Sequence, residues 1–375
     1  MKLMIPKYIL EIIEKDNYLF CGHRKVDFLM PKYDPDYHYL HLTNHNYFLA
    51  LLCLRSYIKL ISDYYLGVII GAKNIDLFIL TASLSSPMGS GSDSKAIPIK
   101  FGNIHSYLVD SSQFGFEPLL LNKLEKVYCY MPSMRGENFD KRHLNQFFHC
   151  EMEIRGKLEE IKPIIVGYVK IMCEIILASK NIVELISADP RRTQKVLEKV
   201  VKQKEFKEIS FDSAVNILEK NGRESLVNYK KNGRDINFAG EIELLRALKS
   251  DLPVWINNFD RDRVPFYQKI DPNNTNKTIN ADLLFPPLLD GAFGGEIVGS
   301  GQRQDNSNEI YESLRRQNLN SEPYEWYINL RRQDKYQITS GFGLGIERFI
   351  SWALGFDDIK NSIIYPRLKN IITYP

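Results

Sequence analysis

The order of apolar and polar positions near the C-terminus predicts a strand that runs directly into a helix. Apolar residues recur there at helical spacing, at Ile346, Phe349, Ile350, Ala353 and Leu354. The preceding run, SGFGLG at 340–345, carries a glycine at every second position. Because glycine adds no side-chain bulk, such a strand can approach a ligand closely. An arginine in the first turn of the helix, Arg348, would meet phosphate oxygens with a fork of donors.

The remaining pattern predicts strands on either side of a helix-rich region. We expect a helix at 47–66, strands at 75–82, 126–131, 147–154, 252–256 and 264–270, a polar turn at 271–280, and mostly helices at 157–250. Strands that flank a helical insert without regular strand–helix alternation favour an α+β fold with an antiparallel or mixed sheet. We divide the chain into an irregular, aromatic-rich extension at 1–45 and one large domain at 46–375.

Composition excludes some classes of protein without naming a function. The net charge of +3 is too small to indicate nucleic-acid binding by itself. Five widely spaced cysteines without a CxxC pair indicate free thiols in a reducing, cytoplasmic compartment. Charged residues interrupt the most apolar stretch, 161–186, so we expect a buried helical hairpin there and no membrane span.

Three groups of residues are candidates for chemistry. The turn at 134–153 combines cations, acids and an aromatic residue in a set that suits a triphosphate, with a solvated, salt-bridged hairpin as the alternative: Arg135, Glu137, Arg142, His143, Phe147, Glu151 and Glu153. Asp282 and Glu296 suit Mg²⁺ beside phosphates, although either acid alone is typical of a surface. A third group, His38, His41 and His45, lacks an acid or cysteine at ligand spacing, so we do not predict a metal site there.

In combination, these motifs resemble the class II aminoacyl-tRNA synthetases, in the asparaginyl/aspartyl branch and nearest its asparaginyl members. MRGENFDKRHLNQF at 134–147 resembles motif 2 of that family, and SGFGLGIERF at 340–349 resembles motif 3. The resemblance runs from about residue 40 to 370. It implies the family's antiparallel sheet flanked by helices, with a helical insertion at about 157–250, and it makes 46–375 a catalytic domain.

The resemblance implies a role for each matching residue on the ATP side. Arg135 would bind the α-phosphate and stabilise charge as the amino acid carboxylate attacks it, which makes it catalytic together with Arg348. Arg348 would hold the γ-phosphate, with Arg142 and His143 nearby. The adenine would lie between Phe147 and Arg348, with Glu137 at its edge and Gly345 in the strand below. Asp282 and Glu296 would hold Mg²⁺.

The resemblance also implies an amino acid subsite. Ser112 and Gln113 match the substrate-recognition segment, and Gln113 would face the substrate ammonium together with Glu151. Arg303 matches the arginine that reads the substrate side chain. Phe116 stands where aspartyl enzymes place a lysine, which argues for asparagine or a related amino acid, because an apolar residue would not compensate a carboxylate.

The sequence departs from the family pattern in four places. Only about 40 residues precede the core, so we expect a paralogue without the anticodon-binding barrel. Phe78 stands at the motif 1 proline; that motif forms the dimer interface in the family, so we expect a homodimer. Ser86 aligns near the glutamate that helps to recognise the ammonium, and 288–294 reads as an insertion.

We therefore expect ATP-dependent activation of asparagine or a related acid, with transfer of the acyl group to a non-tRNA acceptor to form an amide. The alternatives are charging of tRNA by a core-only enzyme, conversion of aspartate to asparagine, and a regulatory paralogue without activity. Phe116 argues against aspartate as the substrate. Retention of the arginines and acids argues against loss of activity.

Overall fold

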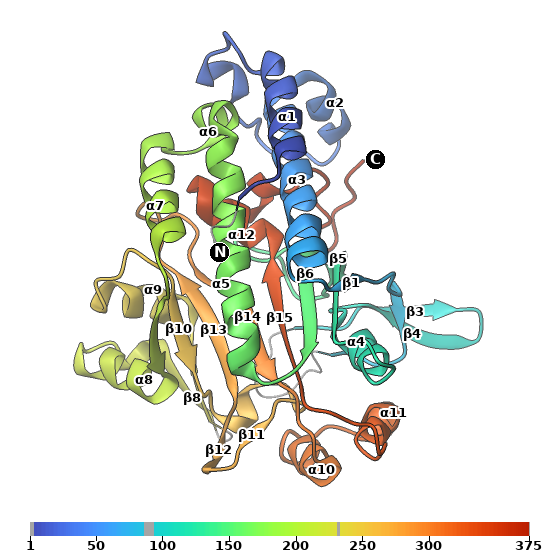
Figure 1. Cartoon of the computed structure of the whole chain (residues 1–375). Helices are drawn as coiled ribbons and strands as arrows, with labels where there is room; N and C mark the ends of the chain where they lie inside the picture. Colours follow the sequence, from blue (N-terminus) through green and yellow to red (C-terminus); the bar gives the residue numbers. More distant parts are fainter. Residues whose placement is uncertain (1–3, 86–93, 231–232, 375) are drawn as a thin grey trace.

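The computed structural model describes residues 4–85, 94–230 and 233–374. Its centre is an eight-stranded sheet in which every pairing is antiparallel except the two at the edges (Figure 1). In spatial order the strands are β1 (Lys73–Asn74), β5 (Lys126–Met134), β6 (Gln146–Arg155), β15 (Thr339–Gly345), β14 (Gly295–Gln302), β13 (Asn280–Phe285), β10 (Val254–Asn257) and β7 (Lys207–Ser210). The α+β architecture expected from the sequence is confirmed.

Helices bury one face of this sheet. The helices against its middle strands are α5 (Leu158–Ala178) and α12 (Ile346–Leu354), and α3 (Asn46–Asp63) packs beside α5 (Figure 1). Cys150 and Met152 of β6, with Phe342 and Leu344 of β15, belong to this hydrophobic core. Because successive residues of a strand point to opposite faces, their neighbours in the sequence are left to the other side of the sheet.

Residues 157–250 are mostly helical, as expected, but they also contribute to the main sheet. The helices after α5 are α6 (Lys180–Ile186), α7 (Pro190–Lys202), α8 (Phe211–Lys220) and α9 (Phe238–Ala247), and β7 forms an edge of the sheet. A small hairpin, β8 (Val227–Lys230) with β9 (Gly233–Ile236), precedes α9. The apolar stretch at 161–186 lies in α5 and α6, and no helix of the described residues has both the length and the apolar character to cross a membrane.

The N-terminal segment is more regular than its sequence indicates. It forms α1 (Lys7–Asp16) and α2 (His38–Asn44), and Ile9 and Ile13 of α1 lie in the same hydrophobic core as the sheet. His38 bonds through a ring nitrogen to the Ile364 carbonyl oxygen at 2.7 Å. Within the described ranges, no three metal-ligating side chains converge.

Two expected strands are wrong. Of 75–82, only β2 (Leu80–Thr81) is a strand, and it pairs with β4 (Ile104–Leu108), which also pairs with β3 (Pro98–Phe101). Residues 264–269 form turns and one isolated bridge, because their apolar side chains pack against the helices α10 (Ser307–Arg316) and α11 (Glu325–Leu330) and not within a sheet: Phe266 and Tyr267 cluster with Tyr324 and Tyr327. The polar turn at 271–280 contains a hairpin of β11 (Ile270–Asp271) and β12 (Asn274–Thr278).

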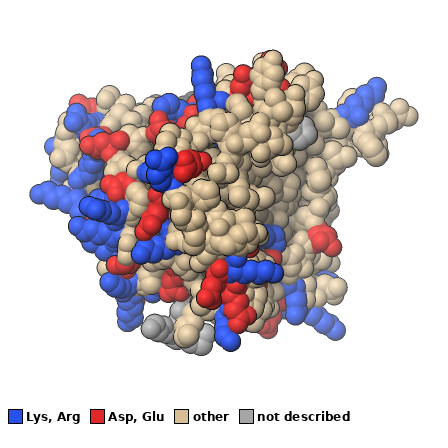
Figure 2. Space-filling model, turned by 90° about the horizontal axis from the view of Figure 1, so that it is seen from above, with Lys and Arg blue, Asp and Glu red and all other residues tan. Residues whose placement is uncertain are grey.

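Charged residues are unevenly distributed over the end of the molecule that carries α1 and α2. Figure 2 shows lysine and arginine side chains gathered along one side of this face and a broad area without charged side chains over its middle. The N-terminal segment exposes several large apolar residues: Tyr8, Leu10, Tyr18, Val26, Leu29, Tyr37, Tyr39 and Leu40. It therefore stabilises the core on one side and presents apolar surface on the other.

Candidate active site

Strand β6 places four side chains in a row on the face opposite the helical core. We call Phe147, His149, Glu151 and Glu153 the β6 row, since they alternate with the core residues Cys150 and Met152. The strand is long because its hairpin partner, β5, pairs with it in unbroken antiparallel register from Lys126 to Met134. The alternating residues of β6 therefore contribute apolar side chains to the core on one face of the sheet and the β6 row on the other face.

Glycines form a flat floor beside the β6 row. In the β15 register, Gly345 pairs with His149, Gly343 with Glu151 and Gly341 with Glu153. A Cβ atom at Gly341 would overlap the side chains of Arg303 and Glu153. The glycine spacing that predicted a close approach to a ligand therefore has a direct structural cause at this position.

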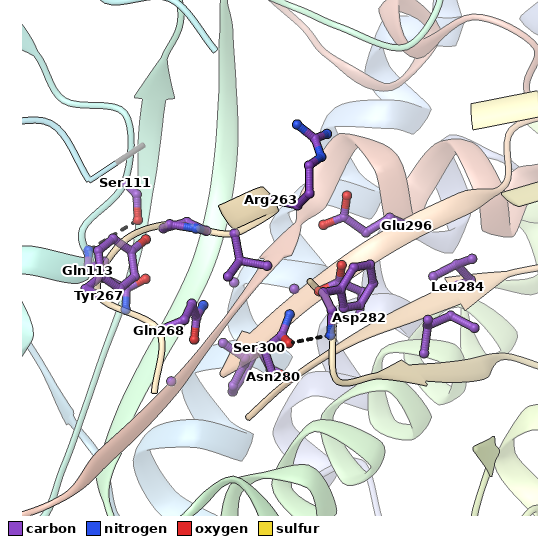
Figure 3. Close-up of a pocket in the computed structure, with 18 of the residues that line it drawn as sticks. Ser111, Gln113, Arg263, Tyr267, Gln268, Asn280, Asp282, Leu284, Glu296 and Ser300 are labelled. Carbon is purple, nitrogen blue, oxygen red and sulfur yellow. Dashed lines mark hydrogen bonds between the residues drawn. The ribbon is translucent and has the colours of Figure 1, made fainter. Parts of the chain in front are cut away.

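Two cavities open over this floor. The larger, of about 350 Å³, reaches from Gln113 and Glu151 to Asp235 and Arg263. Figure 3 shows Gln113, Tyr267 and Gln268 toward one end of it and Asp282, Leu284 and Glu296 toward the other. The smaller has a volume of about 120 Å³. Both are lined by Arg135, His149, Glu296 and Gly343, so the two cavities meet beside the β6 row.

The smaller cavity brings together every residue expected on the ATP side except Asp282, which lines the larger cavity: Arg135, Glu137, Arg142, His143, Phe147, Glu296, Gly345 and Arg348. The guanidinium carbon of Arg135 lies 5.3 Å from the centre of the Phe147 ring. The Nε atom of Arg135 is buried and has no hydrogen-bond partner among the described residues. A buried donor without a partner is costly, and an anionic ligand would satisfy it.

Several of these side chains already have partners. The Glu137 carboxylate accepts a hydrogen bond from the Lys95 backbone at 3.0 Å, and His143 Nδ1 lies 2.9 Å from Asp140 Oδ1. Arg348 donates to the Glu296 carbonyl oxygen at 3.1 Å. These contacts orient the side chains around the cavity before any ligand binds.

Arg142 ties the cavity to the helical region. Its guanidinium carbon lies 3.3 Å from the ring centre of Phe238 and 4.8 Å from that of Phe293, and Nη1 donates to the Gly294 carbonyl oxygen at 2.9 Å. Burial and the nearby Arg348 lower the pKa of Arg142 to about 10. The segment 288–294, expected as an insertion, thus packs behind Arg142 at the smaller cavity.

Asp282 and Glu296 fit a divalent cation. A Cβ atom on Gly299 would lie 3.2 Å from Glu296 Oε1 and 3.6 Å from Asp282 Oδ1, so both carboxylates converge over that residue. Burial, with Glu296 and Glu241 nearby, raises the pKa of Asp282 well above its usual value. A hard cation would compensate this accumulated negative charge, and phosphate oxygens would complete its coordination.

Arg303 is fully paired with an acid of the β6 row. Its Nε and Nη2 atoms donate to the two carboxylate oxygens of Glu153, each at 2.9 Å, and both side chains are at most 3% exposed. Although burial lowers the pKa of Arg303, Glu153 raises it above its ordinary value. The subsite expected for the substrate side chain therefore holds an arginine whose charge is already neutralised.

The other residues expected at the amino acid subsite divide into two groups. Gln113 lines the larger cavity at the start of α4 (Gln113–Leu120), and its amide lies 3.5 Å from Glu153 Oε2. Ser112 lies behind the cavity wall, where its backbone N–H donates to Glu151 Oε2 at 2.6 Å and its hydroxyl donates to the same oxygen. Ser111 donates to the other oxygen of Glu151 at 2.6 Å.

Phe116 is the correction among the expected site residues. It is 1% exposed and packs in a separate apolar cluster with Val109, Leu120, Val127 and Cys129. It lies one helical turn after Gln113 and lines neither cavity of the described structure. Ser86, the other expected departure at this subsite, lies outside the described residues.

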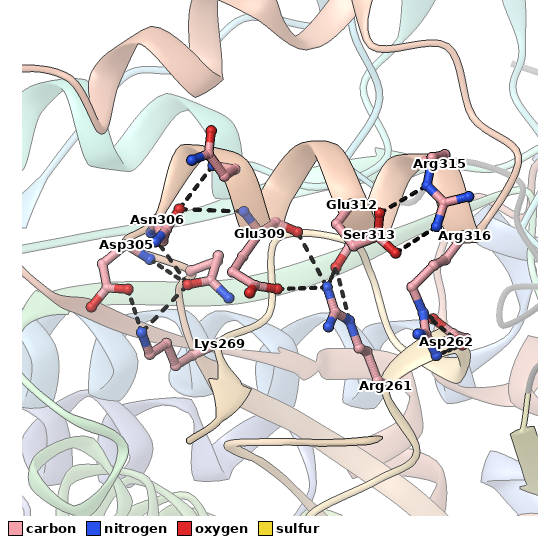
Figure 4. Close-up of polar contacts among 12 residues, drawn as sticks. Arg261, Asp262, Lys269, Asp305, Asn306, Glu309, Glu312, Ser313, Arg315 and Arg316 are labelled. Carbon is pink, nitrogen blue, oxygen red and sulfur yellow. Dashed lines mark hydrogen bonds and ion pairs between the residues drawn. The ribbon is translucent and has the colours of Figure 1, made fainter. Parts of the chain in front are cut away.

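The site residues expected from the sequence do not include one cavity wall, the segment 261–269. Arg263, Val264, Tyr267 and Gln268 of this segment line the larger cavity. Helix α10 and the residues just before it hold the segment in place (Figure 4). Arg261 bonds Glu309 at 2.8 Å and Arg316 bonds Asp262 at 2.6 Å, while Lys269 pairs with Asp305, which precedes the helix. The charged residues at 261–263 were a signal that this segment is not an ordinary half-buried strand.

The chain matches the model of the tRNA synthetases class II (D, K and N) over residues 32–369. It therefore belongs to this family. The asparagine–tRNA ligase of Thermoplasma acidophilum is 30% identical to it over 266 residues, which are 70% of this chain and 57% of that protein. The asparagine–tRNA ligase of Thermococcus kodakarensis is 32% identical over 280 residues, 74% of this chain and 60% of that protein. The chain thus spans less than two thirds of the length of these relatives.

Solved structures of synthetases share the fold of this chain. The asparaginyl-tRNA synthetase of Pyrococcus horikoshii, complexed with asparaginyl-adenylate, superposes with a TM-score of 0.78 at 27% identity, over 90% of this chain and 73% of that one. The Entamoeba histolytica asparaginyl-tRNA synthetase superposes with a TM-score of 0.73 at 22% identity, over 93% of this chain and 74% of that one, which supports the fold alone. The fold implied by the sequence motifs is confirmed.

Proposed function

We propose that this protein activates asparagine, or a closely related amino acid, with ATP to form an aminoacyl-adenylate. The observation that carries the proposal is the junction of the two cavities. The residues of the smaller cavity suit ATP, those of the larger suit an amino acid, and the two meet at Arg135. A ligand that lies along the β6 row would place its reacting carboxylate beside the α-phosphate, and positioning of this kind supplies much of the rate.

On the ATP side, adenine would stack on Phe147, and Arg348, Arg142 and His143 would hold the β- and γ-phosphates. Arg135 would bind the α-phosphate and stabilise the charge that develops there, which is the largest single contribution expected from the protein. Asp282 and Glu296 would hold Mg²⁺, which supplies further compensation of phosphate charge. No protein nucleophile is required, since the amino acid carboxylate itself attacks.

The Arg303–Glu153 pair favours a neutral substrate side chain. An amide can both accept from the arginine and donate to the glutamate. A carboxylate would lie beside an arginine whose charge Glu153 already compensates, and it would add an anion to a buried site. The Arg303–Glu153 pair therefore disfavours aspartate as the substrate, and with it the amidation of aspartate. Phe116, which lines neither cavity in the described part of the chain, does not bear on this choice.

For the acceptor, we propose an amine, so that transfer of the acyl group forms an amide. The larger cavity extends past the β6 row to the ion pair between Arg263 and Asp235, at 2.7 Å, and it gives a small second substrate room beside the adenylate. Charging of tRNA is the second candidate, and the names of the relatives favour it. Assays with total tRNA and with a panel of amines distinguish the two products.

The test is amino-acid-dependent exchange of pyrophosphate into ATP. We expect exchange with asparagine, much weaker exchange with aspartate, and none without Mg²⁺. Absence of exchange over a full panel of amino acids would overturn the assignment and favour a regulatory role.

We also propose a homodimer located in the cytoplasm. Phe78 and Ile79, beside β2, expose large apolar side chains in the motif 1 segment that the family resemblance places at a dimer interface, and Leu52 of α3 and Val68 just after α3 are exposed as well. All five cysteines are free thiols, and an asparagine–tRNA ligase relative from Encephalitozoon cuniculi is named as cytoplasmic. Light scattering of the purified chain would show twice the monomer mass if the dimer forms.

A further inference from the structure

His149 occupies the junction of the two cavities and has no role in the adenylation chemistry described above. Four residues line both cavities, and three of them already have a proposed role. Arg135 would bind phosphate, Glu296 would bind the metal ion, and Gly343 forms part of the flat floor. His149 is the fourth. Its imidazole therefore borders the ATP side and the amino acid side at once.

The order of the β6 row places His149 beside the reacting atoms. Side chains on one face of a strand recur about every 7 Å. Phe147 marks the base, Glu151 the amino group and Glu153 the side chain of the amino acid. The acyl–phosphate bond of an adenylate lies between its base and its amino group, and along the row that interval belongs to His149.

The imidazole is fixed with one nitrogen toward the protein. Its Nδ1 atom lies 3.0 Å from Ser133 Oγ and 3.7 Å from Glu151 Oε1, and its ring packs edge-on against Phe147 at 4.8 Å. The carboxylate beside Nδ1 favours a proton on that nitrogen, donated to Ser133. Only 15% of the side chain is exposed, and that part faces the cavities. The second nitrogen, Nε2, then presents a lone pair to the junction.

We propose that His149 accepts the proton of the amine that attacks the aminoacyl-adenylate. This inference rests on the proposed function and assigns the second step of the same site. The amine nitrogen forms a bond to the acyl carbon, and the acyl–oxygen bond to phosphate breaks, so that its electron pair leaves with AMP. The proton lost by the nitrogen moves to Nε2 of His149, which releases it to solvent after AMP has left.

Burial keeps His149 unprotonated before the step. Together with Arg135 and Arg348, burial lowers its pKa to about 3, whereas Asp110 and Glu296 act in the opposite direction, so Nε2 is free to accept a proton but only weakly basic in the free protein. The imidazole is therefore neutral at physiological pH. The phosphate of an adenylate, lying against Arg135, would offset one of the two arginine charges and make Nε2 more basic when the acyl group is ready for transfer.

The test separates transfer from adenylation. The enzyme–asparaginyl-adenylate complex is isolated and mixed with methylamine, and amide formation is followed over a single turnover. For His149→Gln we expect transfer to fall about 100-fold, a typical effect of losing a general base, while pyrophosphate exchange falls less than about fivefold. Glutamine keeps a polar side chain that can hydrogen-bond but cannot take up the proton. Ser133→Ala, which releases Nδ1, should give an intermediate loss of transfer.

The test includes one control variant, and three of its outcomes would overturn the proposal. His105→Gln changes an exposed histidine of β4 and should leave both rates and the melting temperature as in the wild type. Transfer by His149→Gln at the wild-type rate, an equal fall in both rates, or wild-type transfer no faster than reaction of free adenylate with methylamine would each overturn the proposal. If the wild type forms no adenylate at all, the failure lies in the proposed function.

Discussion

At the scale of residues, the candidate site is a row of side chains along one strand, and each side chain has a separate proposed role. The β6 row runs from an aromatic ring through an imidazole to two carboxylates, and the arginines approach it from other elements. The partner of Glu153 is Arg303, 150 residues away in the sequence. Two substitutions test whether these residues act as their positions indicate.

Replacement of Arg135 by alanine should lower pyrophosphate exchange by about 100-fold or more, because it removes the donor that meets the α-phosphate. Stability should change little, since among the described residues Arg135 Nε has no hydrogen-bond partner to lose and the side chain gives up mainly its contact with the Phe147 ring. Arg135→Lys should recover only part of the rate, because lysine lacks the fork of donors. Exchange rates and melting temperatures of the three proteins check this. Wild-type exchange in the alanine variant would show that the α-phosphate binds elsewhere.

Replacement of Glu153 by glutamine should shift the ligand preference from asparagine toward aspartate. The change leaves the buried Arg303 without its counter-ion, and breaking such a pair costs about 3–5 kcal/mol of stability. A carboxylate ligand would restore the balance of charge. In thermal shift assays with ATP, aspartate should therefore stabilise the variant more than asparagine does. The opposite order, or no ligand effect in the variant when the wild type responds, would exclude a role of this pair in specificity.

At the scale of elements, ion pairs hold one cavity wall against two small hairpins and a helix. Asp260, just before the segment 261–269, accepts from Arg234 of β9 at 2.8 Å and from Lys277 of β12 at 2.7 Å. Helix α10 holds the same segment from its other side (Figure 4). This wall of the larger cavity therefore depends on two hairpins and one helix.

The pairing of Asp260 with Arg234 and Lys277 should make the free energy of unfolding depend on pH in the acidic range. Burial raises the pKa of Asp260, but hydrogen bonds from Arg234 and Lys277 outweigh burial and lower it to about 2. Because the folded pKa lies below the unfolded value, the contribution is present above about pH 4 and is lost as the pH falls toward 2. We expect this contribution to the free energy of unfolding to be about 1–2 kcal/mol, since solvent partly screens the carboxylate.

Urea denaturation between pH 5 and 2.5 checks this expectation. Asp260→Asn should flatten the fall in the free energy of unfolding over this range, whereas Asp334→Asn, at an exposed position, should not. Parallel curves for the wild type and Asp260→Asn would show that the cluster does not control the acid response.

At the scale of the whole molecule, residues 4–45 and the synthetase core share one hydrophobic core. The strand–helix unit at 340–354 and the alternating strand at 147–154 could be predicted because their signals are local. The pairing of Glu153 with Arg303 could not, since nothing local relates two residues so far apart. Phe116 was misplaced because a match of motifs gives a position along a helix and not the direction of its side chain. The segment 264–270 was misread because its apolar residues pack against helices.

The shared core predicts that the N-terminal segment cannot be removed without loss of stability. Ile9 has no exposed surface, so Ile9→Ala should cost about 2–5 kcal/mol through lost burial and the cavity left behind. Its neighbour Leu10 is 42% exposed, and Leu10→Ala should cost much less. Chemical denaturation of both variants makes the comparison. Equal costs would mean that α1 is not packed as the structure shows.

The central claim is that the two cavities together form and hold an aminoacyl-adenylate. Native mass spectrometry of the protein incubated with ATP, Mg²⁺ and asparagine tests it most directly. We predict a bound species with the mass of asparaginyl-adenylate, which disappears in Arg135→Ala and is weak or absent when aspartate replaces asparagine. A protein that binds ATP but forms no adenylate with any amino acid would contradict the account.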